Sequence, residues 1–133
     1  MLLRYALVAD FANVTNEGKV NIVGITDRIF SQQYPAVHRV MFLVMSLETE
    51  HEDDEQTRSI DVQLIDPDAQ LVSRIQGQIE FGSGKQILNQ IHVFQDLLFN
   101  APGNYQFNVF FDERLVKSVE LELVLVSPPP DMV

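Results

Sequence analysis

The stretch Asn104–Phe111, NYQFNVFF, sets the pattern that much of the chain repeats. Its large apolar side chains fall on every second residue from Tyr105 to Phe111, and Gln106 and Asn108 stand between them. Successive side chains of a β-strand point to opposite faces, so this spacing predicts a strand with one apolar and one polar face. Strands of this kind are typical of antiparallel sheets that are solvated on one side.

The same period of two recurs in Arg58–Ile65, Gln70–Phe81 and Ser118–Val126. The segment Arg39–Leu47 differs, because apolar residues occupy both of its faces, and this predicts a strand that is central or covered on both sides. Turn residues separate these segments at the spacing that is typical of a sandwich or a barrel.

The segments Leu2–Ala12 and Lys19–Phe30 predict a first hairpin, in which Gly24 marks a bulge or a close backbone approach. The segment Ile87–Phe94 fits both a strand and a short helix; its β-branched residues and its neighbours favour the strand, and the helix stays an alternative. Counting it gives about eight antiparallel strands. We therefore expect one β-sandwich domain over residues 1–126, jelly-roll-like or immunoglobulin-like, and a Pro-rich tail over residues 127–133.

The composition excludes several classes of function. The 133 residues contain no Cys, which rules out disulfides and thiolate chemistry. The formal net charge is −10 and the nine basic residues are dispersed, so neither nucleic acid nor an anionic membrane is an expected partner. No apolar run reaches the roughly 20 residues that span a bilayer, and no secretory signal is recognised, so we expect a cytoplasmic protein.

The stretch Glu80–Ile87, EFGSGKQI, contains the Gly-Lys pair of a phosphate-binding loop. That motif also needs a glycine five positions before Gly84 and a hydroxyl directly after the lysine. Ile79 and Gln86 occupy those two positions, so the motif fails. We expect a turn instead, in which Gly82 and Gly84 permit positive φ.

The segment Glu48–Glu55 is the densest cluster of charge in the chain. Several oxygen ligands suit Ca²⁺, and this loop could share a cation with the DPDAQ turn. We favour a solvated loop whose like charges repel one another, and we expect no cofactor, with calcium as the alternative. The candidate ligands are Glu50, Glu52, Asp53, Asp54, Asp66 and Asp68.

Large aromatic residues supply the candidate partner surface. Phe94, Phe99 and Phe110 could form an exposed apolar patch, and such patches mark contacts with other proteins. The opposing interpretation is that neighbouring elements bury them.

The stretches DFANVTNEGKVNIVGI and APGNYQFNV, together with the length of chain around them, carry a family resemblance. The chain resembles a family of small uncharacterised bacterial proteins that is classed as a domain of unknown function. The resemblance covers most of the chain and implies a β-sandwich, and it implies no activity, cofactor or site residues.

No catalytic signature emerges, so the enzyme question stays open and we lean toward a non-enzyme. We expect a binding or structural module that acts through contacts with another protein or with a second copy of itself. The alternative is a loop-based ligand-binding or hydrolytic domain that uses calcium.

Overall fold

The computed structural model describes residues 1–51 and 55–127, and these residues form an all-β fold. The all-β prediction is thereby confirmed. Within the described residues no helix is long and apolar enough to cross a bilayer. The strands are β1 (Leu2–Val14), β2 (Val20–Ile25), β3 (Arg28–Ser31), β4 (Ala36–Glu48), β5 (Thr57–Ile65), β6 (Leu71–Glu80), β7 (Ile87–Phe99), β8 (Gly103–Phe111) and β9 (Arg114–Leu125).

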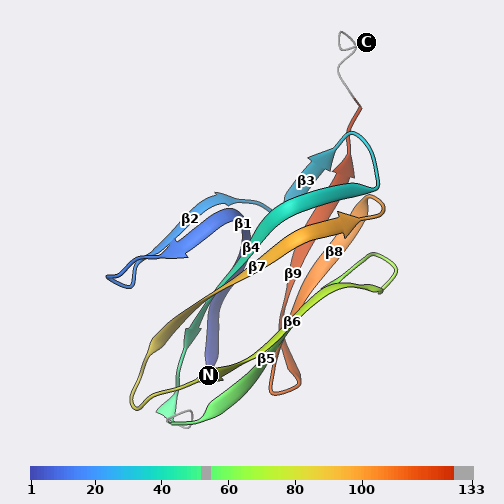
Figure 1. Cartoon of the computed structure of the whole chain (residues 1–133). Coiled ribbons are helices and arrows are strands. Elements are labelled where there is room, and N and C mark those ends of the chain that lie inside the picture. The colour runs from blue at the N-terminus through green and yellow to red at the C-terminus, as the bar shows by residue number, and fades with distance from the viewer. Residues whose placement is uncertain (52–54, 128–133) are drawn as a thin grey trace.

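The strands form two sheets (Figure 1). The four-stranded sheet has the order β2-β1-β4-β7, and the five-stranded sheet has the order β3-β9-β8-β5-β6. Neighbouring strands are antiparallel throughout, except that β3 runs parallel to β9. The strand β4 is central, as its apolar sequence predicts, and the β1–β2 hairpin reaches past the five-stranded sheet at the left of Figure 1.

One hydrophobic core joins the two sheets. The ring of Phe94 in β7 lies 5.0 Å from the ring of Phe107 in β8, and Phe99 packs edge-on against Tyr105 at 4.9 Å. These contacts join the inner face of one sheet to the inner face of the other, so folding removes both inner faces from water. The fully buried members of the core include Val8, Met41, Leu43, Met45, Leu47, Val62, Leu64, Val109, Leu121 and Leu123.

The segment Lys19–Phe30 is two strands, and the prediction of a single strand there is wrong. Its first half, β2, pairs with β1 as the expected hairpin, while its second half, β3, belongs to the other sheet. The break lies at Thr26, whose hydroxyl donates to the Arg28 carbonyl at 2.6 Å and accepts from the Arg28 amide at 3.1 Å. This local turn competes with ladder pairing and releases the chain to the second sheet. It also raises the strand number to nine in the described residues.

The segment Ile87–Phe94 is a strand, and the alternative of a helix is excluded. Each of its residues pairs with β4 in one unbroken register, from Ile87 opposite Glu48 to Phe94 opposite Met41. Long-range pairing with a central strand therefore decides a segment whose own periodicity is ambiguous.

Tyr105 ties the chain together where it enters β8. Its ring is 2% exposed, and its hydroxyl donates to the Ala101 carbonyl at 2.8 Å. Gly103 stands between these residues with a φ of +139°, and a Cβ there would lie 2.7 Å from Pro67. Glycine is therefore required at position 103 by close packing as well as by its backbone conformation.

Candidate functional site

The candidate site is the outer face of the four-stranded sheet, which we call the apolar face. Because side chains alternate, the neighbours of the core residues Val8, Leu43 and Met41 point away from the five-stranded sheet. In β4 these outward residues are Val40, Phe42, Val44, Ser46 and Glu48.

Cross-strand pairing aligns apolar side chains in rows across this face. One row joins Ile25, Ala9, Phe42 and Val93 through their paired Cα positions in β2, β1, β4 and β7. Beside it, the ring of Phe11 packs edge-on against the ring of Phe42, with 5.4 Å between the centroids. Further pairs are Leu7 with Val44, Val44 with Ile91, and Phe11 with Val23.

A reversal in β7 extends the face toward the end of that strand. Asp96 has a φ of +52°, so Phe94 and Leu97 both point into the core although they are an odd number of residues apart. After this reversal Leu98 points outward, together with its partner Val37.

The exposed apolar area of this face is large. Most of the large apolar residues exposed in the described chain lie here, each 41–63% exposed: Leu2, Phe11, Val23, Ile25, Val37, Val40, Ile87, Val93 and Leu98. Since a fully exposed side chain of this size offers roughly 150–200 Å², together they present on the order of 800 Å². The exposed residues surround a buried centre, because Ala9 is 1% exposed and Val44 is 0% exposed. Soluble monomers rarely expose an apolar patch above roughly 600 Å².

Charge is sparse on the same face. The rows between Leu7 and Val23 consist of apolar residues, apart from Gln95 opposite Val40. Toward the end of the sheet, the Arg4 guanidinium donates to the Ser46 hydroxyl at 3.1 Å, and this bond crosses the bulge between Leu3 and Tyr5. The polar residues thus lie toward the rim of the face, and the centre is uncharged.

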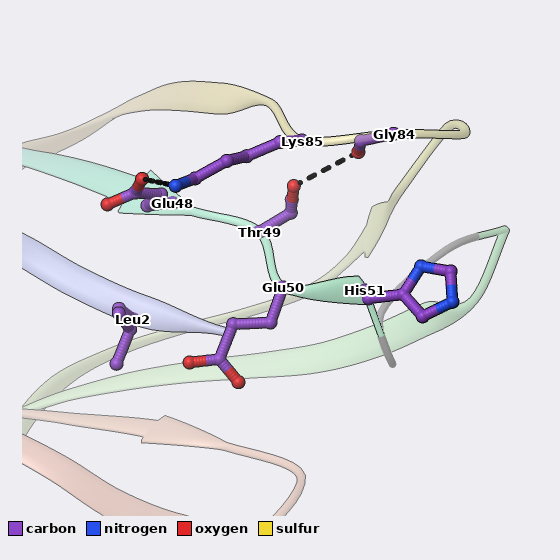
Figure 2. Close-up of a pocket in the computed structure, with 7 residues that line it drawn as sticks. All are labelled: Leu2, Glu48, Thr49, Glu50, His51, Gly84 and Lys85. Carbon is purple, nitrogen blue, oxygen red and sulfur yellow. Dashed lines mark hydrogen bonds and ion pairs between the residues drawn. The ribbon is translucent and has the colours of Figure 1, made fainter.

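A second feature is a hollow of about 480 Å³ beyond the end of β4 (Figure 2). It brings together two stretches that the sequence singled out, the acidic run and the Gly-Lys loop. Leu2, Glu48, Thr49, Glu50, His51, Gly84 and Lys85 line it.

The polar groups of this hollow hold the loop in place. Lys85 Nζ lies 3.0 Å from Glu48 Oε1, and Figure 2 shows the two side chains meeting. The Thr49 hydroxyl accepts from the Gln86 amide at 2.7 Å and donates to the Gly84 carbonyl at 3.3 Å. Glu50 is ion-paired with the N-terminal ammonium at 3.3 Å. These contacts explain why the Gly-Lys sequence forms an anchored turn.

The turn has the predicted backbone at one of its two glycines. Gly84 has a φ of +80°, in the left-handed region that favours glycine. Gly82 does not adopt a positive φ, so the turn uses this freedom of glycine at Gly84 and not at Gly82. A Cβ at Gly82 would lie 3.1 Å from the side-chain nitrogen Nε2 of Gln86. The Gln86 side chain folds back there because its Oε1 accepts a hydrogen bond from the Gly82 backbone amide.

The structure separates the two groups of candidate calcium ligands. Glu50 precedes β5, while Asp66 and Asp68 follow it, so the two loops lie at opposite ends of that strand (Figure 1). Asp66 Oδ1 accepts from the backbone amides of Asp68 and Gln70, at 2.9 and 2.8 Å, and so closes its own turn. In residues 1–51 and 55–127, no three His, Asp or Glu are placed to share a metal ion. The candidates Glu52, Asp53 and Asp54 lie outside the described residues.

The three candidate phenylalanines are placed differently from the predicted patch. Phe94 is 2% exposed and Phe99 is 1% exposed, so their assignment to a partner surface is wrong. Phe94 points inward by the ordinary alternation of β7, opposite the core residue Met41. The reversal at Asp96 turns Phe99 inward as well, and the sequence pattern does not reveal that reversal. Phe110 does lie on an outer face, half-buried opposite Asp61 on the five-stranded sheet.

Among the groups with shifted pKa values, His92 and Asp61 differ in the cause of the shift. Burial lowers the pKa of the His92 imidazole, which faces inward opposite Leu43. Its Nε2 atom is buried and has no hydrogen-bond partner among the described residues. On the five-stranded sheet, the hydrogen bond from Arg74 lowers the pKa of the Asp61 carboxyl, and Gln63 adds to this effect. Arg74 Nη2 lies 2.7 Å from Asp61 Oδ2. His92 is thus shifted by desolvation and Asp61 by a bonded partner.

The fold and the site define an all-β domain of two packed sheets that leaves one apolar sheet face uncovered. The chain belongs to DUF6941, a family of unknown function, whose model matches residues 4–124. This confirms the resemblance to a domain of unknown function. No curated protein matches the chain.

Among solved structures, the chain is similar to a Pseudomonas fluorescens alkylpurine DNA glycosylase, AlkC, bound to DNA that contains an abasic site analog. The TM-score is 0.47 and the sequence identity is 15%, over 89% of this chain and 30% of the glycosylase chain. The chain therefore spans less than a third of that protein.

This finding corrects the exclusion of nucleic acid, since a protein with a similar region is bound to DNA. The exclusion relied on the formal net charge and on the dispersal of the basic residues along the sequence, and neither describes any one face of the folded surface. The DNA is a ligand of that glycosylase, and no ligand follows from it for the present chain.

Proposed function

We propose that this chain is a non-enzymatic protein-binding module and that it binds its partner through the apolar face. The observation that carries the proposal is the set of half-exposed apolar side chains on one sheet face, of which Ile25 is 63% exposed. Burying such a surface against a partner removes it from water and supplies the driving force for association.

The polar hollow supports a structural role more than a catalytic one. Glu48 and Lys85 neutralise each other there, and Thr49 is 2% exposed and engaged with the backbone of the turn. The alternative of a calcium-dependent ligand-binding or hydrolytic domain stays a prediction from the sequence. The contacts of Glu50 and Asp66 with their own chain do not favour it.

For the fold, we propose an immunoglobulin-like sandwich over residues 1–126. Support comes from the order β9-β8-β5-β6, which corresponds to strands G, F, C and C′ of that fold, and from the β4–β7 pair, which corresponds to B and E. Tyr105 supports it too, because its hydroxyl bonds back to Ala101 as in a tyrosine corner. Cytoplasmic localisation and bacterial origin stay predictions from the sequence.

A cross-linking experiment tests the binding face. The chain contains no Cys, so Val93→Cys gives a single thiol on the apolar face that can carry a benzophenone maleimide. Gln76→Cys places the same probe on the exposed outer face of the five-stranded sheet. After illumination in an extract of the native cell, we expect a discrete protein adduct from the probe at residue 93 and none from the probe at residue 76. Equal labelling at both positions, or no adduct at residue 93, contradicts the proposal.

A further inference from the structure

We propose that the partner of the apolar face is a second copy of this chain, which packs face to face across a two-fold axis. This inference rests on the proposed function and adds the identity of the partner. It has three physical supports: the area of the face, its self-complementary chemistry, and the distribution of charge around it.

The area is that of a stable interface. The half-exposed side chains around Phe11, Ile25 and Val93 present on the order of 800 Å², and a standard interface buries about 800 Å² on each partner. Nearly all of this area is aliphatic or aromatic, as expected for the centre of a homodimer interface. The face is therefore large enough to hold two copies together without help from its rim.

The geometry suits a copy of the same sheet. Two sheets that pack face to face align within about 30° and interdigitate their side chains. In a two-fold contact each row of one copy meets a row of the other, so a face that is apolar throughout its centre is complementary to itself. In the row Ile25, Ala9, Phe42 and Val93, Ala9 is buried by its neighbours, while Ile25 and Val93 are 63% and 42% exposed and are available to a facing copy.

Charge selects this face over the others. Each copy carries a formal net charge of −10, so two copies repel when their acidic faces meet. The outer face of the five-stranded sheet carries the acidic residues Asp61, Glu120 and Glu122. Their partners in the strand register are Phe110, Gln106 and Asn104, respectively. The rows at the centre of the apolar face carry no ionisable side chain. Two copies can therefore meet there without placing carboxylates against one another.

The test is the mass of the purified chain in solution. By size-exclusion chromatography with light scattering at about 100 µM, we expect twice the 15.2 kDa of one chain. Raising the salt from about 0.05 M to 0.5 M should tighten the dimer, because salt screens the repulsion between two acidic copies.

Two matched variants separate the apolar face from general charge effects. Val93→Lys and Gln76→Lys each add one positive charge to an exposed strand position. We expect Val93→Lys to raise the dimer dissociation constant by at least tenfold and Gln76→Lys to leave it within about twofold. Val23→Lys, at a residue that is 59% exposed in the edge strand β2, repeats the test at a second position. Circular dichroism checks that each variant keeps its fold.

The outcomes distinguish this inference from the proposed function. A mass of one chain at 100 µM, or a dimer that both Val93→Lys and Val23→Lys leave intact, overturns the second copy as the partner. If the probe at residue 93 then still yields an adduct with a different protein, the proposed function stands alone. If neither a dimer nor an adduct forms, both fall.

Discussion

The outer faces of the two sheets differ, although the inner faces of both sheets are apolar and form the core. On the five-stranded sheet, the outer residues satisfy one another: Arg74 pairs with Asp61 at 2.7 Å, and the Ser118 hydroxyl donates to Asn108 at 2.7 Å. On the four-stranded sheet, the outer residues at the centre of the face are mostly apolar, and Val23 and Ile25 are more than half exposed.

This difference shows what stability requires of each face. The inner faces must be apolar because they form the core, and a solvated outer face can be polar at little cost. On an outer face, apolar side chains that stay more than half exposed gain little for the isolated fold. Its composition therefore points to a contact outside the fold, and the following experiments break or sharpen the contrast, from the largest effect to the smallest.

The largest effect separates inner from outer phenylalanines. Phe94→Ala should lower the free energy of unfolding by about 3–5 kcal/mol, because it leaves a cavity beside Phe107. Phe110→Ala, on the polar outer face, should cost less than about 1 kcal/mol. Urea denaturation followed by circular dichroism measures both. Equal losses would mean that Phe110 belongs to the core.

A smaller effect concerns the bond at the start of β8. Tyr105→Phe keeps the buried ring and removes only the hydroxyl that donates to Ala101. We expect a loss of about 1–1.5 kcal/mol in the free energy of unfolding. Tyr34→Phe is the control with a part-buried hydroxyl, which donates to the Val124 carbonyl at 3.1 Å. An unchanged midpoint for Tyr105→Phe would show that the corner contributes nothing to stability.

His92 is a polar exception on an inner face. Because burial lowers its pKa, the unfolded chain binds the proton more tightly, and the fold loses stability as the pH falls through about 6.5. His92→Leu should remove that pH dependence and stabilise the fold by about 1 kcal/mol at pH 7, since it replaces a buried polar atom that lacks a partner. Denaturation at pH 7 and pH 5 tests this, and parallel losses in both proteins would contradict it.

The smallest effect belongs to the polar outer face. The lowered pKa of Asp61 means that its contribution is fully present above the unfolded pKa and is lost as the pH falls through the folded pKa. Asp61→Asn should therefore be slightly less stable than the wild type at pH 7 and should differ least from it at pH 2. Melting temperatures across this range measure the difference. A constant gap at every pH would assign the effect to packing.

Much of the fold can be predicted from the spacing of side chains. Alternation identifies the strands around Phe107 and Leu121, and both residues are fully buried. The same rule fails at Asp96, where a positive φ reverses the faces, and at Thr26, where a side-chain hydroxyl ends one strand and starts another. These are local backbone events that polar residues permit and that periodicity does not record.

The candidate site could be predicted only in part. The apolar residues on both sides of β4 predict its central place, and the structure confirms that. Whether the outer face of β4 is covered depends on which element packs against it, and the local sequence pattern does not predict that element. The Gly-Lys turn and the acidic run are distant in sequence, and β4 and β7 bring Glu48 and Lys85 together through tertiary pairing.

The parallel pair of β3 and β9 has a consequence for the order of synthesis. Arg28 in β3 pairs with Glu122 in β9, and their side chains also form an ion pair at 3.2 Å. The ribosome releases β3 well before β9, so β3 waits for its partner until the strands between them have emerged. The four-stranded sheet, which needs only residues up to Phe99, can form before that point. Until β8 follows, the inner face of that sheet lacks Phe107, the residue against which Phe94 packs.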